Sequence, residues 1–202
     1  MSTFNKILKR LFDIVASLIG IIILSPIFIV ISIIIKITSP GPIFFKQKRV
    51  GLKGKNFDIL KYRTMVIDAE KQGKQITVGE DKRITPIGRT LRKYKIDELP
   101  QLFNVFKGDM SLVGPRPEVP VYVNMYTEEQ MKVLDVRPGI TDLASLRYRD
   151  ENDVLGSVEN PEEYYINVIM PDKLKLNMEY ISKSSVFFDI SIIIKTIIKC
   201  FK

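Results

Sequence analysis

The chain has 202 residues and a formal net charge of +8, a length that suits one compact domain together with an anchoring segment. It contains no histidine and no tryptophan, and its single cysteine is Cys200. These counts exclude a zinc site of histidine and cysteine and an internal disulfide, and they favour a reducing compartment. The excess of Lys and Arg indicates partners that carry phosphate: nucleic acid, anionic lipid or nucleotides.

An uncharged run of 22 residues, Ile14 to Ile35, lies between Asp13 and Lys36. Sixteen of these residues are Ile, Leu, Val or Phe, and at roughly 0.3–0.6 kcal/mol each they outweigh the Ser, Gly and Pro in the run. A cleavable signal peptide fits poorly, because the run is too long and no small-residue cleavage site follows it. The run therefore predicts a membrane segment.

The topology of this segment is left open by its flanks and by Ser25-Pro26 at its centre. Lys9 and Arg10 precede the run and Lys36 follows it, so the positive-inside rule favours neither orientation. Pro26 lacks an N–H and kinks a helix, and the Ser25 hydroxyl can bond a carbonyl that the kink frees. A segment that re-enters the same face and a kinked single span both agree with the sequence.

The next segment predicts two short strands, "PIFFKQKRVG" and "NFDILKYRTM", around a turn that contains Gly51 and Gly54. Further along, Thr85 has the chemistry of a helix N-cap and is followed by proline. In "DELPQLFNVFKGD" we expect a second helix with Asp97 as its N-cap and Gly108 at its end.

The last predicted element is an amphipathic helix over residues 186–201. Phe187, Ile190, Ile194, Ile197 and Ile198 fall on one side of it, with lysines on the other. A basic amphipathic helix of this kind lies in a membrane interface, and packing against the core of the domain is the alternative.

The acidic pair Asp97-Glu98 is the first candidate for chemistry. At a helix start the backbone N–H groups favour an ionised carboxylate, which can hold a divalent cation or attack phosphorus. A plain helix cap is the simpler interpretation of the pair taken alone. Arginines and lysines beside turns favour the chemical role, because guanidinium groups bind phosphate oxygens bidentately. These cations are Lys61, Arg63, Arg89, Arg92, Arg116, Arg137, Arg147 and Arg149.

Nucleic acid is the competing use of the positive charge. No DNA- or RNA-binding motif is present, and the basic residues are not interleaved with aromatic residues that could stack on bases. A P-loop and a GxGxxG motif after a strand are also absent. The residues therefore predict a membrane-bound protein that handles phosphorylated compounds at a carboxylate-metal centre, and they do not define the reaction.

With these residues in view, the chain resembles the bacterial sugar transferases, specifically the small monotopic phosphoglycosyl transferases. The resemblance rests on "RLFDIVASLIGIIILSPIF", "GPIFFKQKRVG", "FDILKYRTM", "RITPIGRTLRKYKIDELPQLFNVFKGDMSLVGPRP", "VRPGIT" and "DISIIIKTI", in this order. It implies transfer of a phospho-sugar from a UDP-sugar to polyprenyl (undecaprenyl) phosphate, which gives a polyprenyl-diphospho-sugar and UMP. It also implies Mg²⁺ as cofactor.

The resemblance implies roles for individual residues. Asp97 would be the nucleophile that forms a covalent phospho-sugar intermediate, and Glu98 would assist with metal or proton handling, so both are predicted metal ligands. The cations Lys61, Arg92, Arg116 and Arg149 would bind substrate phosphates.

The implied fold is a monotopic α+β membrane-associated protein. Residues 1–38 would form a re-entrant membrane helix broken at Ser25 and Pro26. Residues 39–202 would form a small cytoplasmic α/β catalytic domain with short strands and interfacial amphipathic helices. The location implied is the cytoplasmic face of the bacterial inner membrane, in contact with its lipid, and a homodimer is compatible with the resemblance.

One region departs from the family pattern. After "RPGIT" the family commonly continues with Gly, an apolar residue and Ala-Gln-Val, whereas this chain has "DLASLRYRDEND", with Asp142, Ser145 and Arg147 in unusual places. The departure leaves the sugar open rather than the reaction class. Lys95 also replaces a residue that is small and polar in the family. A catalytically inactive scaffold and a glycosyltransferase that moves sugar without phosphate are the competing functions.

Overall fold

The computed structural model describes residues 3–69 and 81–200, so the ends of the predicted segments 1–38 and 186–201 lie partly outside it. Its helices are α1 (Thr3–Thr38), α2 (Pro86–Lys93), α3 (Gln101–Lys107), α4 (Pro120–Val123), α5 (Leu143–Arg147), α6 (Glu151–Gly156), α7 (Pro161–Tyr164), α8 (Met170–Lys183) and α9 (Val186–Cys200). Its 3-10 helices are η1 (Leu52–Gly54), η3 (Ile96–Glu98) and η4 (Gln130–Asp135), and η5 (Tyr165–Ile169) is π-helical. Its strands are β1 (Phe44–Val50), β2 (Asn56–Tyr62), β3 (Ser111–Val113) and β4 (Gly139–Thr141). The predicted α+β class is confirmed.

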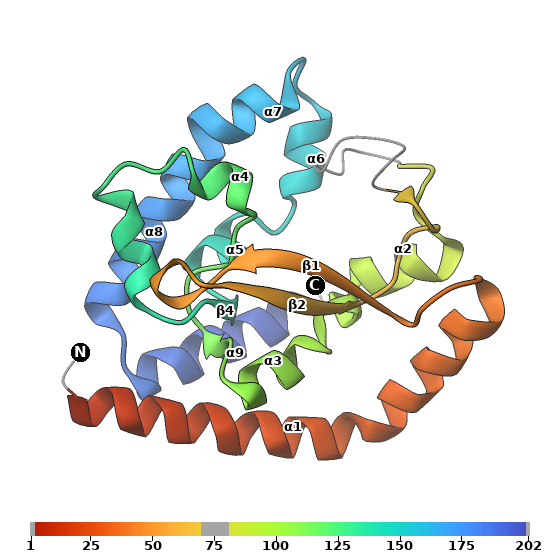
Figure 1. The fold of residues 1–202 in the computed structure, drawn as a ribbon, viewed down its shortest axis with the longest axis horizontal. Coiled ribbons are helices and arrows are strands. Elements are labelled where there is room, and N and C mark those ends of the chain that lie inside the picture. Colours follow the sequence, from red (N-terminus) through yellow and green to blue (C-terminus); the bar gives the residue numbers. More distant parts are fainter. Residues whose placement is uncertain (1–2, 70–80, 201–202) are drawn as a thin grey trace.

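Helix α1 runs along one side of the molecule and bends towards its C-terminal end, with the rest of the chain lying inside the bend (Figure 1). Within the part of the chain that the structure describes, it is the one helix long and apolar enough to cross a membrane. Phe28, Ile31 and Ile35 are buried against the domain, whereas most of the other large apolar side chains of α1 are exposed.

Ser25 and Pro26 lie inside α1 and do not interrupt it, so the predicted break takes the form of a bend in a continuous helix. Because Pro26 has no N–H, the carbonyl of Ile22 lacks its usual donor four residues later. The Ser25 hydroxyl donates to this carbonyl oxygen at 2.8 Å, as predicted for a serine beside a kink.

Both ends of α1 are fastened to the same domain. Near the N-terminal end, Lys9 forms an ion pair with Asp189 of α9, and Arg10 donates to the carbonyl oxygens of α3 residues. Past the C-terminal end, Arg63 donates to the carbonyl oxygens of Ser39 and Pro40. These basic side chains therefore make contacts within the protein that the sequence did not reveal.

Two small sheets organise the remainder. Strands β1 and β2 pair antiparallel, from Phe44 opposite Tyr62 to Val50 opposite Asn56, which confirms the predicted hairpin. Strands β3 and β4 pair parallel, so the segments that follow them leave the sheet side by side. In Figure 1 the β1–β2 ribbon crosses the middle of the molecule, with α3 and α9 on the side of α1 and α4, α6 and α7 on the opposite side.

The predicted helix ends are confirmed in two of three cases. Thr85 caps α2 by accepting from the N–H of Gly88, and Gly108 ends α3 in the left-handed region at φ 105°. The prediction that Asp97 is an N-cap is wrong: Asp97 lies within η3, and Pro100 is the residue before α3. The cause is a run of i to i+3 hydrogen bonds, including Leu99 N–H to Ile96 O, which turns the chain more tightly than an α-helix.

Helix α9 has two apolar sides. Ile192 is fully buried in contact with Val113 and Tyr180, whereas Phe187 is 86% exposed. The predicted apolar side, which also contains Ile190, Ile194, Ile197 and Ile198, is exposed throughout. One side of α9 therefore packs against the core of the domain, and the other side is an exposed apolar face.

Candidate active site

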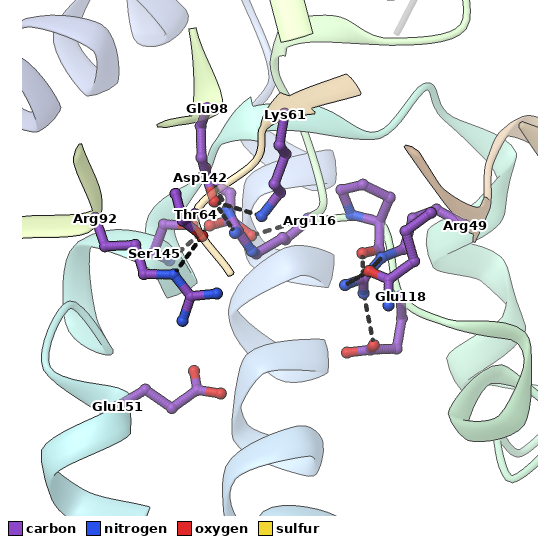
Figure 2. A network of polar contacts seen from close by, with 12 residues as sticks. Arg49, Lys61, Thr64, Arg92, Glu98, Arg116, Glu118, Asp142, Ser145 and Glu151 are labelled. Carbon is purple, nitrogen blue, oxygen red and sulfur yellow. Dashed lines mark hydrogen bonds and ion pairs between the residues drawn. The ribbon is translucent and has the colours of Figure 1, made fainter. Parts of the chain in front are cut away.

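The site is centred on the carboxylate of Glu98, which three cationic hydrogen bonds hold in place. Lys61 of β2 donates to it at 2.8 Å, and the guanidinium of Arg116 donates to both of its oxygens, at 3.1 Å and 2.5 Å. Figure 2 shows these three side chains converging from different parts of the chain. Although burial alone would raise the pKa of Glu98, the charges of Arg116 and Lys61 hold it well below its usual range.

Asp97 directly precedes Glu98, and the hydrogen bonding of its carboxylate differs from that of Glu98. It is 7% exposed, and its Oδ1 atom is buried without a hydrogen-bond partner among the described residues. Burial and the neighbouring charge of Glu98 raise the pKa of Asp97 to about 6, against the opposing effect of Lys61, Arg92 and Lys95. A carboxylate with an unpaired oxygen beside several cations is poised to bind or attack an electron-poor centre.

The backbone of β2 is aligned with α3 by a single amide side chain. Asn104 of α3 accepts from the N–H of Leu60 at 2.9 Å and donates to the carbonyl of Asp58 at 2.8 Å. Because Lys61 follows directly, this clamp sets where its ammonium group lies relative to η3. The Asn104 side chain is buried, and a polar residue inside the apolar run "LFNVF" is the sequence signal that could have identified it.

Arg92 reaches the site from α2 because that helix lies very close to the end of β2. A Cβ atom on Gly88 would lie 2.2 Å from the carbonyl oxygen of Thr64, so only glycine allows this approach. One turn later, Arg92 donates from Nε to the hydroxyl of Thr64 at 2.8 Å. Burial lowers the pKa of Arg92, and the charge of Asp97 opposes that shift.

Arg116 lies in a rigid loop that follows β3. The backbones of Gly114 and Gly139 touch: a Cβ on Gly139 would lie 2.1 Å from the Gly114 nitrogen. On the far side of the loop, Arg49 donates to the carbonyl of Pro117 at 3.2 Å, as part of the second group of contacts in Figure 2. The Arg116 side chain remains 38% exposed, so its guanidinium can still meet a substrate.

Several of the predicted cations have contacts other than the Glu98 carboxylate. Arg149, predicted as a phosphate ligand, has its ion pair with the adjacent Asp150 at 3.9 Å. Arg137 donates to the carbonyl of Gly108, and Arg147 pairs with Asp172 at 3.5 Å. Of the four predicted phosphate ligands, Lys61 and Arg116 contact Glu98, and Arg92 is electrostatically coupled to Asp97.

The donor set for a metal ion is small. Across residues 3–69 and 81–200, no group of three or more Asp, Glu, His or Cys side chains lies together. Both oxygens of Glu98 already accept hydrogen bonds from cations, whereas Asp97 has a free oxygen. Mg²⁺ is commonly held by one or two carboxylates together with substrate phosphates. The geometry therefore fits a magnesium ion at Asp97 better than at Glu98.

Fold and site together define a protein with a long apolar N-terminal helix and a carboxylate centre surrounded by cations, which suits phosphate-bearing ligands. The family model described as "Bacterial sugar transferase" matches residues 4–202. The chain belongs to the bacterial sugar transferase family, as its motifs predict.

Three curated relatives illustrate the match. The chain is 39% identical over 97% of its length to UDP-N-acetylgalactosamine-undecaprenyl-phosphate N-acetylgalactosaminephosphotransferase of Aeromonas hydrophila, and covers 44% of that protein. It is 37% identical over 100% of its length to UDP-glucose:undecaprenyl-phosphate glucose-1-phosphate transferase of Escherichia coli (strain K12), and covers 42% of it. It is 37% identical over 96% of its length to the uncharacterized sugar transferase EpsL of Bacillus subtilis (strain 168), and covers 87% of it. The chain thus spans less than half of the first two relatives.

Proposed function

We propose that this protein is a phosphoglycosyl transferase that moves a phospho-sugar from a UDP-sugar to polyprenyl phosphate and releases UMP. The observation that carries the proposal is the buried, unpaired oxygen of Asp97 beside the cations that Glu98 gathers. The names of two relatives, which describe sugar-phosphate transfer to undecaprenyl phosphate, support the same reaction.

The reaction proceeds in two displacements at one phosphorus atom. The Asp97 carboxylate attacks the phosphorus that bears the sugar, a new bond forms from its oxygen to phosphorus, and the bond to the UMP oxygen breaks. UMP leaves with the electron pair. An oxygen of polyprenyl phosphate then attacks the same phosphorus, and Asp97 leaves as a carboxylate. Two displacements allow both anionic substrates to use one site in turn.

The cations stabilise the charge that gathers at this phosphorus. Arg116 is partly exposed and Lys61 lies beside it on Glu98, so both can share their hydrogen bonds with phosphate oxygens. Arg92, held by Thr64, has the charge and position to serve the same centre. Glu98 then acts by orienting two cations, and Arg149 stays a predicted phosphate ligand.

Magnesium is part of the proposal. Asp97 would hold it through the carboxylate oxygen that does not attack phosphorus, together with oxygens of the diphosphate, and Glu98 would join only by giving up contacts with Lys61 or Arg116. When bound, the ion offsets the negative charge of the diphosphate and polarises its phosphorus.

The membrane placement we propose is re-entrant, with the domain on the cytoplasmic face. Both ends of α1 contact the same domain, through Lys9 with Asp189 at one end and Arg63 with Ser39 at the other. A helix that crossed the bilayer would separate its ends by the hydrocarbon thickness of about 30 Å. The bend of α1 in Figure 1 allows the apolar middle of this helix to enter the membrane while both ends stay on one side.

Topology is tested by cysteine labelling in a Cys200→Ser background. Lys6→Cys and Lys53→Cys report on the two sides of the membrane segment, and Ser25→Cys reports on its centre. We expect an impermeant reagent added from the cytoplasmic side to label residues 6 and 53 alike and to leave residue 25 unlabelled. Labelling of residue 6 from the opposite side would contradict the re-entrant placement.

The reaction is tested by identifying the nucleotide released from a panel of UDP-sugars mixed with enzyme, Mg²⁺ and polyprenyl phosphate. We expect UMP, which requires cleavage between the two phosphates. Release of UDP would instead assign a glycosyltransferase that moves sugar without phosphate. Release of no nucleotide from any UDP-sugar would favour a scaffold, and the UDP-sugar that reacts identifies the sugar.

A further inference from the structure

The buried carboxylate of Asp142 links two segments beside the site. This residue is 0% exposed and directly follows β4. Its Oδ1 accepts from the N–H of Ser145 at 2.6 Å and caps α5, and its Oδ2 accepts from the N–H of Arg116 at 3.2 Å. Figure 2 places it in the same network as Glu98 and Arg116.

The Arg116 amide is an unusual point of attachment. Its neighbours Pro115 and Pro117 have no N–H, so Arg116 has the only backbone donor in this three-residue stretch. The parallel pairing of β3 with β4 brings the two strand ends together, and Gly114 donates to the carbonyl of Thr141 at 3.0 Å. Asp142 thus takes the one backbone hydrogen bond that this part of the loop can donate.

We propose that Asp142 is a positioning residue that fixes the backbone of Arg116, and through its guanidinium the carboxylate of Glu98, for phosphate chemistry. This assignment rests on the proposed function for its catalytic consequence, but the contact itself does not. Without the bond from Asp142, the loop keeps its prolines and its contact with Arg49 and loses the constraint at the residue that meets the substrate.

Charge supports the same assignment. Glu98 raises the pKa of Arg116 most strongly, and the charges of Asp142 and Glu151 add to that effect. Arg116 stays protonated throughout, and no titration is involved. If residue 142 were glycine, both the hydrogen bond to the Arg116 amide and the negative charge of Asp142 would be absent.

Asp142→Asn tests the contact without changing the size of the side chain. The amide oxygen can still cap α5, but the NH₂ group then faces the Arg116 N–H, and two donors cannot bond. We expect hydrogen–deuterium exchange at the Arg116 amide to accelerate about tenfold or more, as loss of one buried hydrogen bond implies. Unchanged exchange at Arg116 would overturn the proposal.

Asp13→Asn is the matched control. Asp13 is also buried and accepts a backbone N–H from β3, the strand before the Arg116 loop: that of Leu112 at 3.0 Å. Because the amide oxygen of this variant can still accept from Leu112, exchange at Leu112 and at Arg116 should stay unchanged, whereas Asp142→Asn should accelerate exchange at Arg116. Should Asp142→Asn fail to fold, Asp142→Ser retains a good cap for α5 and is too short to bond Arg116 as well.

The catalytic consequence is tested by a double-mutant cycle in UMP release. Asp142→Asn should lower kcat about tenfold or more in the wild-type background and less than about threefold in the Arg116→Gln background, because its effect passes through Arg116. Asp13→Asn should lower activity by one and the same factor in both. Equal effects of Asp142→Asn in both backgrounds would refute the positioning role.

The two experiments separate the two claims. If the wild-type protein released no UMP, the proposed function would fall, while the exchange measurement would still decide whether Asp142 holds Arg116. If UMP is released and the cycle shows no coupling, the proposed function stands and the assignment of Asp142 fails.

Discussion

Two clusters of buried charge in this protein differ in how completely their groups are paired. At the junction of α1 and α9, Asp189 accepts from Lys9 with one oxygen and from the Tyr180 hydroxyl with the other, and Lys9 also donates to the carbonyl of Val113. At the site, one oxygen of Asp97 has no hydrogen-bond partner among the residues that the structure describes. Complete pairing suits a structural role, and the unpaired carboxylate has reactivity at the expense of stability.

Burial raises the pKa of both Asp189 and Asp97, so the two clusters differ in how their oxygens are paired and not in the direction of the pKa shift. The pKa of Asp97 is raised to about 6, so the folded protein binds this proton more tightly than the unfolded chain does. The stability that the group contributes is present below its unfolded pKa and is lost as pH rises through about 6. At neutral pH the ionised Asp97 therefore destabilises the fold, as a group kept for chemistry would.

Asp97→Asn is the substitution with the largest expected effect on activity. We expect UMP release to fall by about 10⁴-fold or more, because the amide cannot act as nucleophile. Thermal unfolding should move upwards by a few degrees, because a buried charge without full pairing is removed. A variant that retained activity would contradict the role of Asp97, and a lower melting temperature would contradict the contrast with Asp189.

Glu98→Gln should follow, with a loss of about 10²-fold in kcat. The neutral amide has one acceptor oxygen in place of the two charged oxygens of the carboxylate. Lys61 and Arg116 therefore lose the contacts that align them. The melting temperature should also fall, since two cations are left without their counterion. If Glu98 instead acted mainly as a metal ligand, raising the Mg²⁺ concentration would restore most of the activity.

Asp189→Asn should give the opposite profile. Removing one partner of this buried pair costs about 3 kcal/mol, which corresponds to a fall of several degrees in melting temperature. Activity per folded molecule should stay within about threefold of wild type. A large loss of kcat below the melting transition would mean that the two clusters are coupled and that the comparison is wrong.

The pH dependence of the first displacement is the next effect in size. With UDP-sugar and no polyprenyl phosphate, the rate of UMP release in a single turnover should fall about tenfold per pH unit below about 6, as Asp97 becomes protonated. Omitting the acceptor excludes the ionisation of its own phosphate. A rate that stayed constant down to pH about 4 would show that Asp97 ionises like an ordinary aspartate.

Lys95→Asn should have the smallest effect. Lys95 adopts a left-handed conformation, φ 57° and ψ 20°, which asparagine tolerates better than lysine. We expect a gain of about 0.5 kcal/mol in the free energy of unfolding, measured by denaturant titration. Because the charge of Lys95 lowers the pKa of Asp97, the acid limb of the pH profile should also move slightly upwards. A loss of stability would mean that Lys95 makes a contact worth more than the strain.

The sequence predicted correctly those elements that depend on turn and capping residues close together in the chain. The hairpin, the cap at Thr85, the end of α3 at Gly108 and the Ser25 bond at the bend all follow from turn and capping chemistry. The start of α3 was missed, because tight turns around a proline follow from hydrogen bonds that no single residue type specifies.

The site was accessible from sequence only in part. The family motif marks Asp97 and Glu98, but the pairing of Glu98 with Lys61 and Arg116 joins segments far apart in the chain. The bond from Asp142 to the Arg116 amide depends on the parallel pairing of two three-residue strands, too short to predict from periodicity. Long-range contacts of this kind become visible only once the fold is known.

The most direct test of the central claim is the mass of the intact protein after incubation with a reactive UDP-sugar and Mg²⁺ in the absence of polyprenyl phosphate. The account predicts an added phospho-sugar that fragmentation locates on Asp97, that disappears when polyprenyl phosphate is added, and that Asp97→Asn never acquires. UMP release under turnover conditions with no such adduct, or an adduct on another residue, would contradict it.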